Sequence, residues 1–246
     1  MLNGFPRILI IRFSAIGDVV RTLPALHALR DAFPHAQIDW AVEKKALDIV
    51  AGHPAVDQVH VFERPEGLLN GIREFRQFCR TLRENRYDVA IDFHGIFKSG
   101  WASRATRAKD RYGFAPPRAK ECSHIFSNHR VRLSSPLLNR VEENLALSEA
   151  AGAPGSSVDV MIAIPEEVED TIDAYIQNEF QSAKRIVAVH APVDRPEKQW
   201  PISRYAELVD MLQSDGRFEV LLTWGPGQRE EVEAICLKSR RNPHIA

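Results

Sequence analysis

Short apolar runs alternate with amphipathic segments along most of the chain, and this alternation restricts the choice of folds more than any other feature. The first run, Arg7–Phe13, is rich in branched aliphatic residues, as expected for a strand buried on both faces. Similar runs follow at Gln37–Val42, Gln58–Phe62 and Tyr87–Phe93, with helical patterns between them. The alternation predicts an α/β fold with a parallel sheet and right-handed crossovers.

The segments between the strands are predicted from their periodicity. A single helix is expected between Val19 and Pro34, and a long amphipathic helix with a basic outer face is expected at Leu68–Asn85. Gly113–Ser135 shows little periodicity, which predicts loops with one or two short strands.

The composition of Gly152–Ser157 is typical of a linker and predicts two domains, residues 1–155 and 156–246. The second domain offers two clear strand patterns, Arg185–His190 and Phe218–Thr223. A doubly wound domain usually has five or six strands. We therefore expect the second domain to be incomplete and the chain to be a C-terminally shortened version of a longer protein.

Composition and cysteine spacing predict a cytoplasmic protein. The 246 residues are 44% hydrophobic and 26% charged, without an apolar run of the roughly 20 residues that span a bilayer and without a signal peptide. The three cysteines lie far apart and form no CxxC pair. This spacing predicts free thiols in a reducing compartment and argues against a disulfide framework or a zinc site.

The small net charge of −1 hides an asymmetry between the two predicted domains. Residues 1–155 hold 22 Lys and Arg against 17 Asp and Glu, whereas residues 156–246 hold 10 against 16. The basic excess is largest at residues 98–140, with ten cations and two acids. Such a segment attracts anionic partners, or it is simply a solvated basic face.

The loop after the first strand, Ser14–Asp18, lies where ligands bind in open α/β sheets. A dinucleotide fingerprint requires several glycines there, but the loop has only Gly17, followed by an acid that would repel a pyrophosphate. A nucleotide-dependent oxidoreductase is therefore disfavoured. The carboxylate of Asp18 can act as a general base, or it can stabilise the helix dipole by about 0.3–1 kcal/mol.

Four blocks in the same order resemble glycosyltransferase family 9, the ADP-heptose:lipopolysaccharide heptosyltransferases. The first is residues 7–42, with its strand, Ser-containing turn, Gly-Asp pair and Thr-Leu-Pro helix start. The others are Tyr87–Gly100, Val187–Leu208 with Lys-Gln-Trp-Pro, and Val220–Glu231. The resemblance covers nearly the whole chain from Arg7 onward.

This resemblance implies a glycosyltransferase-B fold, in which two Rossmann-like domains with parallel sheets lie on either side of a cleft. The N-terminal domain would bind the acceptor and the C-terminal domain the ADP-sugar. The reaction implied is inverting and metal-independent transfer of heptose from ADP-heptose to the lipopolysaccharide inner core, with a Kdo–lipid A type acceptor. No cofactor and no nucleic-acid partner are expected. An anionic acceptor fits the basic N-terminal half and implies peripheral contact with the anionic inner membrane.

The resemblance also assigns roles to individual residues. Asp18 corresponds to the catalytic base. Lys198 corresponds to the lysine on the donor phosphates, where a cation is needed because departing ADP develops negative charge. The remaining assignments are Ser14, Lys98 and Ser99 for acceptor binding and Glu230 for the nucleoside of the donor. A turn serine at position 14 and a solvated loop lysine at position 198 are the alternative readings.

Two departures from the family pattern weaken the predicted donor site. Pro192 lies where some members carry hydroxyl residues that contact phosphate, and proline offers no N–H donor. The later glycine-rich donor block of the family has no counterpart in these 246 residues. A non-catalytic module that binds anionic glycolipid therefore remains the alternative to an active transferase.

Overall fold

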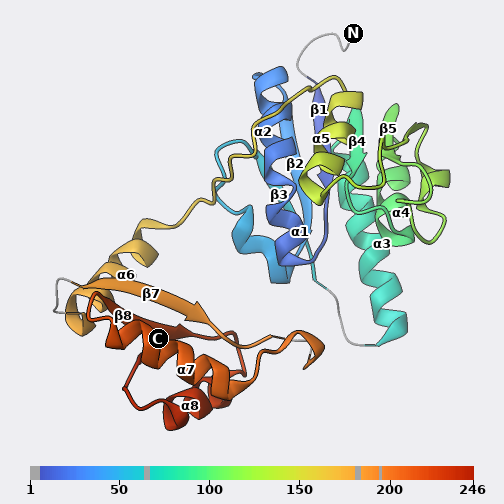
Figure 1. The fold of residues 1–246 in the computed structure, drawn as a ribbon. Helices are drawn as coiled ribbons and strands as arrows, with labels where there is room; N and C mark the ends of the chain where they lie inside the picture. The colour runs from blue at the N-terminus through green and yellow to red at the C-terminus, as the bar shows by residue number, and fades with distance from the viewer. Residues whose placement is uncertain (1–5, 64–66, 181–183, 194–195) are drawn as a thin grey trace. The chain divides into compact units, whose positions relative to one another are not determined.

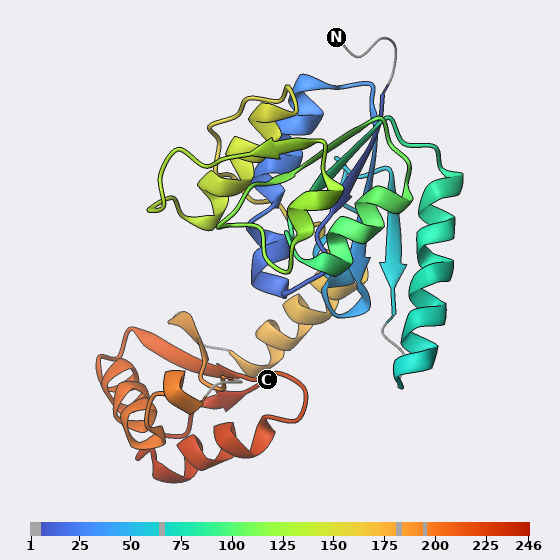
Figure 2. The ribbon, with the colours of Figure 1, turned by 90° about the vertical axis from the view of Figure 1, so that its right-hand side faces the viewer.

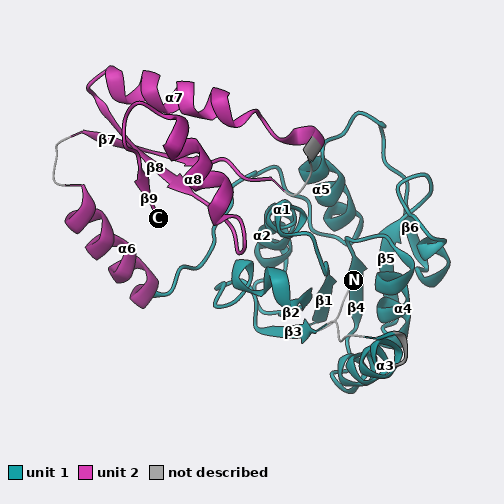
Figure 3. Cartoon of the chain, turned by 90° about the horizontal axis from the view of Figure 1, so that it is seen from below, with its two compact units in different colours: residues 1–165 teal, residues 166–246 magenta. Residues whose placement is uncertain are grey.

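The computed structural model describes residues 6–63, 67–180, 184–193 and 196–246. The chain divides into two compact units, residues 1–165 and 166–246, which Figure 3 colours separately. The division falls after Pro165, whereas the linker composition predicts it after residue 155.

Unit 1 is a parallel sheet with helices on both faces (Figure 1). Its strands are β1 (Arg7–Ile11), β2 (Gln37–Glu43), β3 (Gln58–Phe62), β4 (Val89–Asp92), β5 (Asp110–Phe114) and β6 (His129–Val131). Its helices are α1 (Ile16–Val20), α2 (Leu23–Ala32), α3 (Leu68–Glu84), α4 (Phe97–Ala105) and α5 (Arg140–Ala150), with short 3₁₀ turns η1 (Lys44–Ile49) and η2 (Ser123–Phe126).

The strand order β3-β2-β1-β4-β5-β6 is that of a Rossmann-type sheet, and every pairing is parallel. The order reverses between β1 and β4, which pair from Ile8 with Val89 to Ile11 with Asp92. The loops that follow these two strands leave the same edge of the sheet in opposite directions. This topological switch point is where an open α/β sheet binds its ligand.

Strand β1 is buried on both faces because helices cover the sheet from both sides. Ile8 and Ile10 belong to the core beneath α2 and α5, whereas Leu9 and Ile11 belong to the core beneath α3 and α4. Figures 1 and 2 show these two helical layers on opposite faces. The predicted α/β fold with a buried central strand is confirmed.

The single helix predicted between Val19 and Pro34 is wrong, because the structure has two helices, α1 and α2. The hydroxyl of Thr22 donates to the carbonyl of Asp18 (2.8 Å), and α2 begins one residue later with Pro24 in its first turn. A proline has no N–H for a continuous helix, but it is favourable in the first turn of a new one. The break makes α1 a short helix that carries Asp18.

Helix α3 is strongly amphipathic, as the sequence predicts. Its inner face places Phe75, Phe78, Cys79 and Leu82 against the sheet, and its outer face is rich in exposed arginine. It has 17 residues and many charges. Within the described residues, no helix combines the length and apolarity needed to cross a bilayer.

Unit 2 is a smaller layer of three parallel strands in the order β7-β8-β9. Its elements are α6 (Glu166–Glu179), β7 (Arg185–His190), η3 (Pro196–Lys198), α7 (Ile202–Ser214), β8 (Phe218–Thr223), α8 (Arg229–Lys238) and β9 (His244–Ile245). Both predicted strands are present with the predicted bounds. Strand β9 was not predicted, because two residues are too few to produce a periodic pattern. It pairs with Leu221 and Leu222 of β8.

Gly100 offers a test of how α4 packs. A Cβ atom there would lie 2.7 Å from Cδ2 of Phe126 and 3.0 Å from the carbonyl of Ser123, in the turn that covers α4. We expect Gly100→Ala to lower the free energy of unfolding by about 1–3 kcal/mol, the usual cost of overpacking. The measurement is urea denaturation followed by circular dichroism.

The matched control is Gly71→Ala in α3, where a Cβ atom would meet nothing within 4 Å. This substitution should raise stability by about 0.5–1 kcal/mol, because alanine loses less backbone entropy than glycine in a helix. Equal stability of the two variants would contradict the packing of α4 against η2.

Candidate functional site

The candidate site lies at the carboxyl edge of the sheet in unit 1, where β1 and β4 end side by side. The backbone joins the two strand ends, since the N–H of Phe93 donates to the carbonyl of Ile11 (3.1 Å). The guanidinium of Arg12 then reaches across, and its NH1 group donates to the carbonyl of Phe93 (2.8 Å). The loop after β1 is thereby tied to the loop after β4.

Arg12 is an almost completely buried cation, with 5% of its surface exposed. Its NH2 group forms an ion pair with Oδ2 of Asp18, and its Nε atom is buried without a hydrogen-bond partner in the described structure. Burial lowers the pKa of Arg12, the nearby carboxylates of Asp18 and Asp92 raise it, and the charges of Arg118 and Arg140 lower it. Arg12 is therefore the cationic centre of the site.

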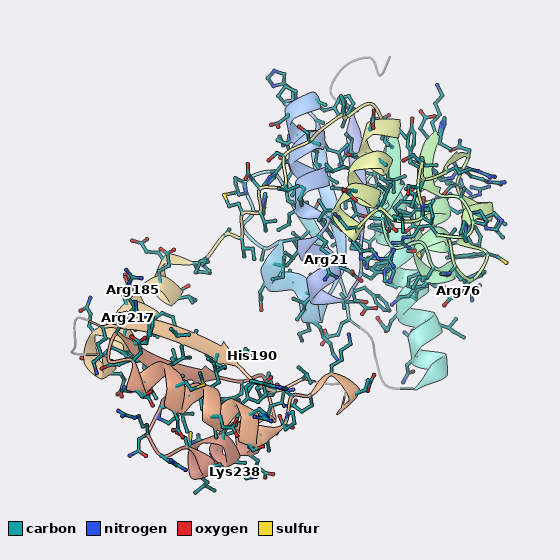
Figure 4. The ribbon with its side chains drawn as sticks, in the orientation of Figure 1. Arg21, Arg76, Arg185, His190, Arg217 and Lys238 are labelled. Atoms are coloured by element: carbon teal, nitrogen blue, oxygen red, sulfur yellow. The ribbon has the colours of Figure 1, made fainter. Side chains whose placement is uncertain are left out.

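Asp18 lies in α1 with its carboxylate at the edge of the site. Oδ2 is held by Arg12 and Oδ1 lies 3.2 Å from NH1 of Arg21, while 31% of the side chain stays exposed. Figure 4 labels Arg21, which follows α1 directly and whose side chain is 55% exposed. The arrangement orients one carboxylate and leaves it reachable from solvent.

Asp92, the last residue of β4, shapes the second loop. Its Oδ1 accepts the N–H groups of His94 and Gly95, both at 3.0 Å, and its Oδ2 lies 3.0 Å from the hydroxyl of Ser99. Gly95 has a φ of 74°, a backbone conformation that a side chain would strain. Burial raises the pKa of Asp92 to about 6, although these hydrogen bonds and Arg12 oppose the shift. The carboxyl group thus fixes residues 93–99 around itself.

His94 belongs to the loop after β4 and is electrically neutral near pH 7. Burial lowers the pKa of His94 to about 3, and the positive charges of Arg12, Lys98 and Arg118 contribute, while Asp18 raises it. Its ring packs 6.1 Å from that of Phe13, and its Nδ1 is buried without a partner in the described structure. Two buried polar atoms, this nitrogen and Nε of Arg12, thus lie unpaired in one small region.

The predicted acceptor residues have different environments. Ser14 is half-buried in the loop after β1. Ser99 is fully buried, and its hydroxyl accepts the N–H of Ile96 (3.1 Å) beside Asp92, so it holds the loop in place. Lys98 forms an ion pair with Glu43 (2.6 Å) and lies over the ring of Phe62 (3.9 Å). Direct acceptor contact by these three side chains stays a prediction.

The sequence analysis missed Arg12, Asp92 and a second basic group next to them. In that group Glu143 binds Nε of Arg118 (2.7 Å) and NH1 of Arg140 (2.5 Å). Arg118 also approaches the carbonyl of His94 (3.5 Å). A charged residue directly after an apolar strand was the available signal for Arg12. Arg118 lies in irregular sequence and Arg140 begins α5, so only the fold brings them near Arg12.

The predicted donor residues lie in unit 2, on the loops that follow its first two strands. Lys198 ends η3, after β7, and Glu230 lies in the first turn of α8, after β8. Both side chains are exposed. Figure 4 labels His190 at the carboxyl end of β7, where Nδ1 lies 3.1 Å from the hydroxyl of Thr223 at the end of β8. The two loops therefore leave the same edge of the small sheet.

Comparisons with known proteins agree with this architecture. The model of glycosyltransferase family 9 (heptosyltransferase) matches residues 75–243. Lipopolysaccharide heptosyltransferase 1 of Escherichia coli K12 is 30% identical over 235 residues, which cover 92% of this chain and 70% of that protein. A family 9 glycosyltransferase from Veillonella parvula gives a TM-score of 0.88 at 21% identity, over 100% of this chain and 70% of that one. The structure of an E. coli heptosyltransferase with ADP-2-deoxy-2-fluoro heptose gives a TM-score of 0.73 at 24% identity. The match covers 94% of this chain and 73% of that one.

Two α/β units, each with its own parallel sheet, together with these structural relatives define a glycosyltransferase-B type fold. The chain belongs to glycosyltransferase family 9, and the protein is a glycosyltransferase. It spans 60–70% of the length of curated relatives such as the lipopolysaccharide heptosyltransferases 1 and 3 of Escherichia coli K12.

The raised pKa of Asp92 gives a stability prediction. A folded-state pKa of about 6 exceeds the ordinary value of 3.8, so the folded protein binds this proton more tightly than the unfolded chain. The resulting stabilisation is present below about pH 4 and is lost as the pH rises through about 6. Asn at this position keeps an oxygen for the two N–H groups and does not titrate.

We therefore expect the stability of Asp92→Asn, relative to the original protein, to rise between pH 4 and 6 by up to about 3 kcal/mol, since one pKa unit corresponds to about 1.4 kcal/mol. Urea denaturation at a series of pH values measures this difference. Stability curves that stay parallel over this range would show that Asp92 does not titrate as a buried acid.

Proposed function

We propose that this protein is an inverting, metal-independent glycosyltransferase that transfers heptose from ADP-heptose to the lipopolysaccharide inner core, with a Kdo–lipid A type acceptor. Family membership and the relative from E. coli K12, named lipopolysaccharide heptosyltransferase 1, support the sugar and the acceptor class. The observation that carries the proposal is the carboxylate of Asp18, oriented by a buried arginine and still partly exposed at the switch point of the sheet.

In the proposed reaction, Asp18 accepts the proton of an acceptor hydroxyl as this oxygen attacks the anomeric carbon of the heptose. The bond between that carbon and the phosphate oxygen of ADP breaks on the opposite face, which inverts the configuration. The bonding pair leaves with ADP, and the proton stays on the carboxyl group. A positioned base of this kind typically contributes about 10²–10⁴ in rate.

The donor part of the proposal assigns ADP-heptose to unit 2. Lys198 would place a positive charge on the phosphates, which accumulate charge as ADP departs. Glu230 would contact the nucleoside. The E. coli structure with ADP-2-deoxy-2-fluoro heptose supports an ADP-linked sugar as donor. Both side chains are exposed on loops at the carboxyl edge of their sheet, where ligands bind in this fold class.

The acceptor part of the proposal assigns the anionic lipid-linked core to unit 1. The cations Arg12, Arg21, Arg118 and Arg140 gather around the loops after β1 and β4. Their field attracts an acidic, phosphorylated acceptor to the exposed carboxylate of Asp18. The basic segment 98–140 continues from this edge, and we propose that it contacts the anionic membrane that contains the acceptor.

Asp18→Asn should lower the turnover of heptose transfer by about 10²–10⁴-fold, because the amide keeps the size of the side chain but cannot take the proton. The measurement is donor-dependent product formation with ADP-heptose and a deacylated core acceptor. Asp31→Asn is the matched control, since Asp31 is an exposed acid of α2 in the same unit. It should have normal turnover.

Normal turnover of Asp18→Asn would contradict the assignment of the base. An original protein that binds the acceptor but forms no product with any ADP-sugar would favour the alternative, a non-catalytic module for anionic glycolipid.

A further inference from the structure

A hollow of about 290 Å³ lies between α3 and α4 on the outer side of their helical layer. We refer to it as the arginine groove, because five exposed arginines line it together with Cys79, Trp101 and Ala105. The arginines are Arg76, Arg80 and Arg83 of α3, Arg104 of α4, and Arg107, which follows α4. Figure 4 labels Arg76 on this side of unit 1. Among the residues that the structure describes, no acidic side chain lines the groove.

The charge of the groove is not neutralised by the protein. Within the described residues, none of the five arginine side chains takes part in a hydrogen bond or an ion pair, whereas the side chains of Arg12, Arg30 and Arg118 all have carboxylate partners. Like charges one helical turn apart, such as Arg76 and Arg80, repel each other and destabilise a helix. Five cations that converge on one hollow form an anion site whose counter-charge comes from another molecule.

An exposed apolar ridge lies beside the groove. It consists of Phe97 and Trp101, each 48% exposed, and Ile125, which is 55% exposed. The rings of Phe97 and Trp101 stack with their centroids 6.2 Å apart, and both pack edge-on against Phe126. Trp101 also lines the arginine groove, so the cationic and apolar surfaces are continuous.

We propose that the arginine groove and this apolar ridge dock the protein on an anionic phospholipid surface, with a lipid phosphate in the groove. Tryptophan and phenylalanine beside arginine are typical of side chains that lie at a membrane interface. A nucleic acid fits less well. Phe97 and Trp101 each cover one ring face of the other, which leaves fewer faces for bases, and Ile125 adds aliphatic surface that a polar backbone would not cover.

The position of this surface indicates what docking would achieve, and this step of the inference rests on the proposed function. Helix α4 begins at the carboxyl edge of the sheet, where Phe97 adjoins Lys98 of the candidate site, and then runs away from that edge. The apolar ridge therefore extends from the site toward the groove. A protein docked in this way has its acceptor site next to the membrane in which a lipid-linked acceptor is anchored. The basic segment 98–140 supplies only two of the five groove arginines, and the other three belong to α3.

The test is co-sedimentation of the full chain with vesicles of phosphatidylglycerol and with vesicles of phosphatidylcholine. The original protein should bind the first and not the second, and binding should weaken with salt, because exposed charges are screened over about 8 Å at physiological ionic strength. Arg76→Gln together with Arg80→Gln should weaken binding by about 30-fold, since each arginine near an anionic surface contributes about 1 kcal/mol. Trp101→Ala should weaken binding at high salt as well.

The matched control is Arg185→Gln with Lys238→Gln, which removes two exposed cations from unit 2 (Figure 4). Control and groove variants have the same net charge, so a purely global charge effect would weaken both equally and overturn the proposal. Unchanged vesicle binding of the groove variant would overturn it too. So would a single-stranded oligonucleotide that binds the groove more tightly than the vesicles and displaces them.

Different measurements test the docking proposal and the proposed function. Heptose transfer to a deacylated, water-soluble acceptor does not need docking, so the groove variant should retain full turnover there. The same variant should lose turnover on an acceptor embedded in phosphatidylglycerol vesicles. Absence of heptose transfer by the original protein in both assays would reject the proposed function. The vesicle experiment would still show whether the arginine groove and the apolar ridge bind anionic lipid. Equal loss of turnover on both acceptors would overturn docking as the role of the groove.

Discussion

The buried guanidinium of Arg12 is the interaction on which the candidate site depends. It donates to the carbonyl of Phe93 in one loop, pairs with Asp18 in the other, and is influenced by the charge of Asp92. A cation this deeply buried is costly unless it is paired, and removal of one partner leaves the other uncompensated. The loops after β1 and β4 are therefore held together by the same charge that orients the proposed base.

The order of the strands explains why these groups meet. Arg12 and Phe93 are far apart in sequence, but β1 and β4 are neighbours at the point where the order reverses. Asp92 then fixes the second loop through Gly95 and Ser99. The outer helical layer adds a separate cationic surface with exposed aromatic residues. One sheet thus supports the candidate reaction site at its edge and the proposed docking surface on a helical face.

The fold was largely predictable because strands buried on both faces give continuous apolar runs, and β3, β7 and β8 have the predicted bounds. The break between α1 and α2 was not predictable, since the hydroxyl contact that accompanies it leaves no periodic signal in the sequence. Strand β9 was not predictable either, because it pairs through only two residues. Within the site, Asp18 stood out by its position after the first strand. Arg118 and Arg140 come near Arg12 only through the tertiary fold. The five arginines of the groove, in α3, in α4 and just after α4, come together only after the helices pack.

The central claim is that Arg12 acts on the reaction through Asp18, and a double-mutant cycle tests it most directly. Turnover on a water-soluble acceptor would be compared among the original protein, Arg12→Gln, Asp18→Asn and the double variant. Groups that act as one unit give non-additive losses. The account predicts that the double variant is about as slow as Asp18→Asn alone. Losses that multiply in the double variant would show that the two residues act independently and would contradict the account.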